Sequence, residues 1–167
     1  MKIIWLEGHG GGNGGESYSL AWYFAARHTS IDSLLKRGQK GILITIGDEP
    51  CHGSLGCDSI KKLFGDTLEG NKDIEASQIL KEAQESWHVY HINLQDYMGR
   101  KPSVQEGWKK YLGERVINTE DGEGRDIPDI ISGIILGAVN IDKMKVRVSI
   151  ETSSSSEIKE TTVNHLR

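Results

Sequence analysis

The apolar positions of this chain fall into short runs separated by longer segments of helical period. Residues 41–47 are a continuous apolar run rich in β-branched side chains, which is typical of a central strand covered on both faces. Residues 88–94 and 114–118 have the same β-type composition, and residues 2–6 predict a further short strand. The chain is therefore expected to contain several short strands.

The segments between these strands favour helices. Residues 16–28 are apolar on most sides, which predicts a deeply buried helix. Shorter helices are predicted over 31–37, 59–64 and 104–112. A further helix is expected from Ile74, with one apolar face formed by Ala76, Ile79, Leu80, Ala83 and Trp87.

Capping residues mark some helix ends. Ser30 is expected to cap the helix over 31–37, and Gly38 stands where a helix-ending glycine belongs. Asp126 is expected to cap a last helix, with Pro128 tolerated in its first turn. One side of that helix is formed by Ile130, Ile131, Ile134, Ile135 and Ala138.

The alternation of strands and helices predicts an α/β fold, a Rossmann-like three-layer arrangement with a mainly parallel sheet and helices on both faces. One domain is expected over residues 1–143. Residues 144–151 alternate between apolar and polar side chains, which predicts an edge strand. Residues 152–167 are rich in Ser, Thr and charge, and a disordered tail is expected there.

Composition narrows the function classes. The 167 residues fit one domain, and the net charge of −4 gives no overall basic footprint for nucleic acid. No apolar run approaches the roughly 18 residues that span a bilayer, and the N-terminal apolar stretch ends at Glu7, so a cytoplasmic location is expected. Four basic side chains are interpreted as a solvated face: Arg100, Lys101, Lys109 and Lys110.

The two cysteines are interpreted as free thiols. Cys51 and Cys57 are the only cysteines, and no secretory signal is present to suggest an oxidising compartment. His52 adjoins Cys51, but five residues separate the two cysteines, and this spacing matches no common zinc motif.

The candidate site begins at residues 8–15, which contain six glycines and precede the helix that starts at about Glu16. Ligands collect at the carboxyl ends of the strands in open α/β sheets, and Asp48 stands at that end of the 41–47 strand. If the two segments pack side by side, Asp48, Glu16 and Asn13 supply oxygen atoms around one point. Such a set suits Mg²⁺, Ca²⁺ or Mn²⁺. Hydroxyls are available nearby in the sequence from Ser17 and Ser54.

Simpler interpretations of both acids stay open. Glu16 in a first helical turn is favoured by the helix dipole, and Asp48 at a strand end is a common turn residue. A phosphate site is a further alternative, because Gly10, Gly12 and Gly15 satisfy G-x-G-x-x-G. Glu16 argues against it, since a carboxylate repels phosphate at a helix N-terminus.

Catalytic signals are weak. None of the six histidines forms a nucleophile-and-base pattern, and no G-x-S-x-G motif occurs. His88 and His91 adjoin or lie within a predicted strand and are assigned packing or surface roles. The chain is therefore expected not to be an enzyme. A nucleotide-binding enzyme fragment and a structural protein without any site remain as alternatives.

Two segments together resemble a known family. Residues 10–27 (GGGNGGESYSLAWYFAAR) and 40–49 (KGILITIGDE) are similar to the von Willebrand factor A (VWA)-like domains of bacterial and phage proteins. Residues 73–92 and 127–138 resemble the later elements of such domains. The resemblance covers roughly residues 3–140 and corresponds to the C-terminal two-thirds of the domain.

The resemblance implies a Rossmann-like sheet with a metal-ion-dependent adhesion site and a protein-binding, non-enzymatic role. Asp48 matches the ligand of the third loop of that site, and Glu16, with Asn13 as an accessory, matches an acidic version of the second. The Asp-x-Ser-x-Ser motif of the first loop does not occur in this sequence. Metal binding is therefore expected to be weak or absent, in a clipped, split or degenerate domain.

The resemblance also predicts association. The first strands of the family fold have no counterpart here, so the strand over 41–47 loses its central neighbour. An exposed apolar edge invites pairing. The expected partner is another protein or a second copy of this chain, with no nucleic acid and no membrane involved.

Overall fold

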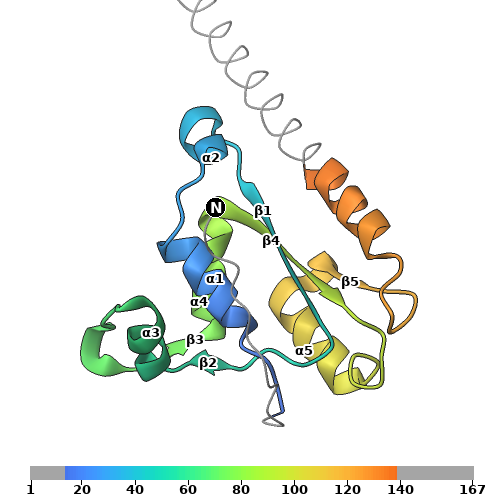
Figure 1. Cartoon of the computed structure of the whole chain (residues 1–167), viewed down its shortest axis with the longest axis horizontal. Helices are drawn as coiled ribbons and strands as arrows, with labels where there is room; N and C mark the ends of the chain where they lie inside the picture. The colour runs from blue at the N-terminus through green and yellow to red at the C-terminus, as the bar shows by residue number, and fades with distance from the viewer. Residues whose placement is uncertain (1–13, 139–167) are drawn as a thin grey trace, which may run out of the picture.

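The computed structural model describes residues 14–138, which form a mixed α/β unit (Figure 1). Its main sheet has three parallel strands in the order β1–β4–β5. β1 (Gly41–Gly47) pairs with β4 (Trp87–Asn93) along its full length, and β5 (Val116–Asn118) pairs with the last three residues of β4. The parallel α/β sheet predicted from the alternation of elements is thus confirmed.

The described residues also form six α-helices and two short 3-10 helices. The last of them, over 127–138, carries no label in Figure 1 and is drawn in orange. A second, antiparallel pair of very short strands lies beside α3. The remaining elements are α1 (Tyr18–Arg27), α2 (Asp32–Arg37), β2 (Ser54–Leu55), α3 (Cys57–Phe64), η1 (Glu69–Asn71), β3 (Ile74–Glu75), α4 (Ala76–Ser86), α5 (Pro102–Leu112) and η2 (Gly113–Arg115).

Helices cover both faces of the sheet because successive side chains of a strand point to opposite faces. Val89 of β4 packs in the larger core, with α1, α4 and α5. Its neighbour Tyr90 packs in the smaller core, with the helix over 127–138. The largest fully buried side chains of the first core include Trp22, Tyr23, Ile60, Ile79 and Trp108.

The run over 41–47 is a strand with the expected bounds, and within residues 14–138 it lies at one edge of the sheet. Among the described residues β1 pairs with β4 alone, and β4 is the strand with neighbours on both sides. Ile46 is 43% exposed as a result. A continuous apolar run records that a strand is apolar on both faces, not whether both of its edges are paired.

Helix ends were predicted to within a few residues, but two caps differ. Ile31, not Ser30, is the N-cap of α2, and no side chain caps that helix. Gly38 ends α2 in the left-handed conformation with φ 64°, as expected. The Asp126 carboxylate accepts a hydrogen bond from the Glu120 main chain, so its side chain ties down the preceding loop rather than the helix.

Some predictions lie outside the described residues. These are the strand over 2–6, most of the glycine-rich stretch including Asn13, the edge strand over 144–151 and the tail over 152–167. Within residues 14–138, no helix is long and apolar enough to cross a membrane.

Candidate functional site

The carboxyl ends of β1 and β4 lie side by side and each leads into a loop that carries an aspartate. The Leu94 N–H donates to the Gly47 carbonyl at 2.9 Å, which ties the two exits together. Asp48 follows β1 directly, and Asp96 stands three residues after the end of β4. Because parallel strands end at the same edge of a sheet, the two carboxyl groups meet.

Asp48 and Asp96 form a hydrogen-bonded carboxyl pair. Burial raises the pKa of Asp48, and the hydrogen bond to Asp96 and its negative charge raise it further. The pKa of Asp96 is lowered, chiefly because its carboxylate accepts the main-chain N–H groups of Gly99 and Met98 at 2.9 and 2.8 Å. When the pair binds one proton, that proton therefore lies on Asp48, and Asp96 carries the charge.

Asp96 was missed by the sequence analysis. The available signal was a second acid just after the neighbouring predicted strand, followed by Gly99 three residues later. An aspartate in that position bonds the backbone of its own turn. That two acids at the ends of neighbouring strands lie close together can be predicted only when the strand order is known.

Glu16 lies beside the segment that follows Asp48. Its N–H donates to the Pro50 carbonyl at 2.9 Å, and its carbonyl accepts the His52 N–H at 3.1 Å. These bonds form an isolated parallel bridge between Glu16 and Cys51. The structure thus brings together the two chain segments predicted to meet, through their backbones, while the Glu16 side chain is exposed. Asn13 lies outside the described residues.

Close packing holds the end of the glycine-rich stretch in place. Gly15 is buried, and a Cβ there would lie 2.9 Å from the Pro50 carbonyl oxygen. Gly14 has φ 77°, a conformation that L side chains rarely adopt. Glycine is therefore required at these two positions for Glu16 to reach the loop after Asp48.

Tyr18 occupies the space between the acidic segments. A Cβ at Gly47 would lie 1.9 Å from the Tyr18 hydroxyl oxygen, so this hydroxyl needs a glycine at the end of β1. The pKa of Tyr18 is raised above its usual range, first by burial and then by the charges of Asp48 and Glu16, while a hydrogen bond from the Glu49 main chain opposes the shift. Asp48 and Glu16 therefore act on the same phenol. Tyr18 was not singled out in the sequence.

The buried imidazole ring of His91 packs against Tyr18. Its ring stacks on Trp108 with centroids 3.5 Å apart and contacts Tyr18 edge-on at 5.1 Å. Its Nδ1 lies 2.9 Å from the Thr45 hydroxyl oxygen. Burial lowers the pKa of His91 to about 3, so the ring is neutral at physiological pH. The packing role assigned to this histidine agrees with its complete burial.

The cysteines and serines do not extend the site. Cys51 and Cys57 are free, and their Sγ atoms donate to different main-chain carbonyls, those of His52 and Asn71. Burial raises the pKa of Cys51 to about 11, which keeps it a thiol. Ser17 is the N-cap position of α1, and Ser54 pairs with Glu75 between β2 and β3.

The described residues offer few side chains that could bind a metal ion together. Within residues 14–138, no group of three or more His, Cys, Asp or Glu side chains is placed to hold a metal ion. The Asp48–Asp96 pair supplies carboxylate oxygens, which are the ligands that Mg²⁺ and Ca²⁺ prefer. The pair suits a hard cation chemically but needs further ligands to complete a coordination sphere.

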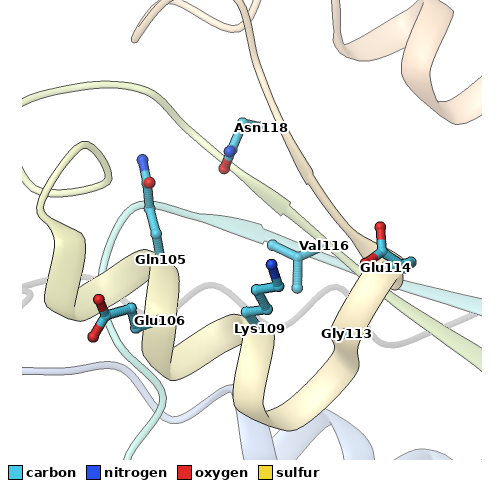
Figure 2. Close-up of a pocket in the computed structure, with 7 residues that line it drawn as sticks. All are labelled: Gln105, Glu106, Lys109, Gly113, Glu114, Val116 and Asn118. Carbon is cyan, nitrogen blue, oxygen red and sulfur yellow. The ribbon is translucent and has the colours of Figure 1, made fainter.

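A separate hollow of about 340 Å³ lies between α5 and β5. Figure 2 shows the side chains of Gln105 and Lys109 rising from α5 toward the strand that carries Val116 and Asn118. Its lining mixes amides with both signs of charge, and neither Asp48 nor Asp96 contributes to it. The lining residues are Gln105, Glu106, Lys109, Gly113, Glu114, Val116 and Asn118.

Comparison with known proteins does not identify this arrangement. No protein-family model matches the sequence, and no curated protein or solved structure matches the chain.

Proposed function

We propose that this chain is a non-enzymatic protein-binding module of VWA-like, Rossmann-like fold. The observation that carries this proposal is the meeting of Asp48, Asp96 and the Glu16 segment at the carboxyl ends of β1 and β4. This edge of an open α/β sheet is where ligands bind. Acidic side chains gather there, and the buried histidine beneath them is held neutral.

The proposed site takes a divalent cation, Mg²⁺ or alternatively Ca²⁺ or Mn²⁺, with weak affinity. Asp48 and Glu16 are proposed as ligands and Asn13 as an accessory, and the position of Asp96 adds a carboxylate beside Asp48. A bound cation would supply a positive charge that bridges to an acidic group on a partner protein. Because a cation binds the ionised carboxyl groups and the pKa of Asp48 is raised, we expect affinity for the cation to rise with pH.

The proposed partner is a protein, either a different one or a second copy of this chain. Among the described residues, one edge of β1 pairs with no strand, and this supports the proposal because unpaired N–H and C=O groups beside the exposed Ile46 are a template for association. The net charge of −4 does not favour nucleic acid.

The metal part of the proposal is tested by thermal unfolding during titration with MnCl₂ or MgCl₂. At a cation concentration of ten times Kd, binding stabilises the folded state by about 1.4 kcal/mol, which shifts Tm by a few degrees. We expect that shift for the wild type and for Asp129→Asn, an exposed carboxylate on the helix over 127–138 that serves as the matched control. Asp48→Asn and Glu16→Gln should reduce it. Equal shifts for the wild type and Asp48→Asn would refute the cation site.

A further inference from the structure

Within residues 14–138, β1 lies at an edge of the sheet and pairs with β4 on one side only. Its seven residues contain no charge and no proline, the devices that keep sheet edges from pairing. Of the two ionisable residues that flank the strand, Lys40 donates to the Gln84 carbonyl of α4 at 2.5 Å, and Asp48 is hydrogen-bonded to Asp96, so both are engaged within their own chain.

The hydrogen-bond pattern shows which peptide groups point outward. The Gly47 carbonyl accepts the Leu94 N–H, so Gly47 is turned toward β4. Alternate residues of a parallel strand bond to the same neighbour. The main-chain groups of Ile42, Ile44 and Ile46 therefore point to the open edge. The side chain of Ile46 is 43% exposed, and Ile42 and Ile44 are only partly buried.

The sequence of this edge is almost symmetric about its centre. Residues 41–47 read Gly-Ile-Leu-Ile-Thr-Ile-Gly, so the outward residues Ile42 and Ile46 are equally spaced around Ile44. When two such strands pair antiparallel about a two-fold axis at Ile44, each outward isoleucine lies opposite an outward isoleucine. Pairs of this type exchange both main-chain hydrogen bonds. A closed two-fold arrangement needs one self-complementary surface, which this edge provides.

We propose that two copies of this chain pair through β1, antiparallel and centred on Ile44, to form one continuous six-stranded sheet. In this register Lys40 of one copy lies opposite Asp48 of the other, at both ends of the paired strands. The isoleucines of both copies form one apolar stripe on the sheet face that packs against the helix over 127–138. This inference specifies the partner of the proposed protein-binding function but requires no metal.

The oligomeric state is the first test, measured by sedimentation velocity of the full 167-residue chain over a concentration series with EDTA present. A dimer of about 37 kDa is expected, because one chain has a mass of 18.5 kDa. Ile46→Lys should weaken dimerisation at least tenfold, since it places a charge on the paired edge. Ile135→Lys is the matched control, because Ile135 is 45% exposed but lies on the helix over 127–138. It should leave the dimer unchanged.

Cross-linking tests the register in a Cys51→Ser, Cys57→Ser background. Ile44→Cys places two thiols opposite each other across the two-fold axis, where Cα atoms of a hydrogen-bonded pair lie about 5.5 Å apart. That spacing permits a disulfide. Ile42→Cys faces residue 46 of the other copy rather than its own equivalent, so it should not cross-link under the same mild oxidation.

Several results would overturn this inference. A monomer at all concentrations would do so, including a monomer in which another segment of the same chain covers β1. A dimer that resists Ile46→Lys would place the interface elsewhere, and equal cross-linking at positions 42 and 44 would exclude the register. The cation titration of Asp48→Asn is independent of these results. Equal cation-induced shifts of Tm for the wild type and Asp48→Asn, with an intact dimer, would therefore refute only the metal part of the proposed function.

Discussion

The buried histidine beneath the site yields the sharpest prediction, because its titration is coupled to folding. His91 is fully buried among Tyr18 of α1, Trp108 of α5 and Thr45 of β1. Its pKa is lowered from 6.5 to about 3 by burial. Between these two values the unfolded chain binds a proton at this position and the folded chain does not.

The sign of the effect follows from this difference. When the unfolded state binds more protons, the free energy of unfolding falls as pH falls. The slope is about 1.4 kcal/mol per pH unit for one group. From pH 7 to pH 5, His91 alone should therefore remove about 2 kcal/mol of stability. Local rearrangement relieves part of this cost, so we expect a loss of about 1–2 kcal/mol.

The assay is urea unfolding of the wild type and His91→Gln at several pH values between 7 and 5. The variant is expected to be less stable at pH 7, because glutamine does not reproduce the ring stack on Trp108. The difference in unfolding free energy between the wild type and the variant should then shrink by about 1–2 kcal/mol at pH 5, since glutamine does not titrate. Val89→Ala, a buried non-titrating change in the same strand, is the control and should give a constant deficit. A constant deficit for His91→Gln would refute the assignment of a neutral buried imidazole.

Two further predictions concern the scaffold. Gly65 ends α3 with φ 78° and open space around its Cβ position, whereas Gly107 lies inside α5, also with open space. Gly65→Ala should therefore cost about 1 kcal/mol through backbone strain, while Gly107→Ala should gain about 0.5–1 kcal/mol through helix propensity, both measured by urea unfolding. Asn93 is fully buried, and its Nδ2 donates to the Gly99 carbonyl and to the Asn118 side chain at 3.0 and 2.9 Å. Asn93→Ala should destabilise the fold by about 1–3 kcal/mol, and an unchanged unfolding midpoint would show that these bonds contribute nothing.

Much of the fold was predictable because local patterns of apolar and polar residues determine where its strands and helices lie. A continuous apolar run located β1, and helical period located the face of α4 that packs in the core, formed by Ala76, Ile79, Leu80 and Ala83. Trp87, assigned to the same helix face, is instead the first residue of β4. The very short β2 and β3 were missed, because two-residue strands have no period to detect.

The candidate site was predictable only in part. Asp48 was found because it interrupts an apolar run, and the approach of the Glu16 segment followed from the expected parallel packing. Asp96 and Tyr18 were not found, because their importance depends on neighbours that are distant in the chain. Asp96 belongs to the site because it forms a hydrogen bond with Asp48, and Tyr18 belongs to it because its hydroxyl lies against Gly47.

The sequence by itself determined the order of strands and helices and the acid at the end of β1, because these depend on periodicity and on residues near one another in the chain. Only the tertiary structure decided that, within residues 14–138, β4 lies between β1 and β5, because strand order depends on contacts between distant segments. The same contacts raise the pKa of Asp48. Burial and the adjoining Asp96 carboxylate cause this rise, and neither is encoded in the local sequence.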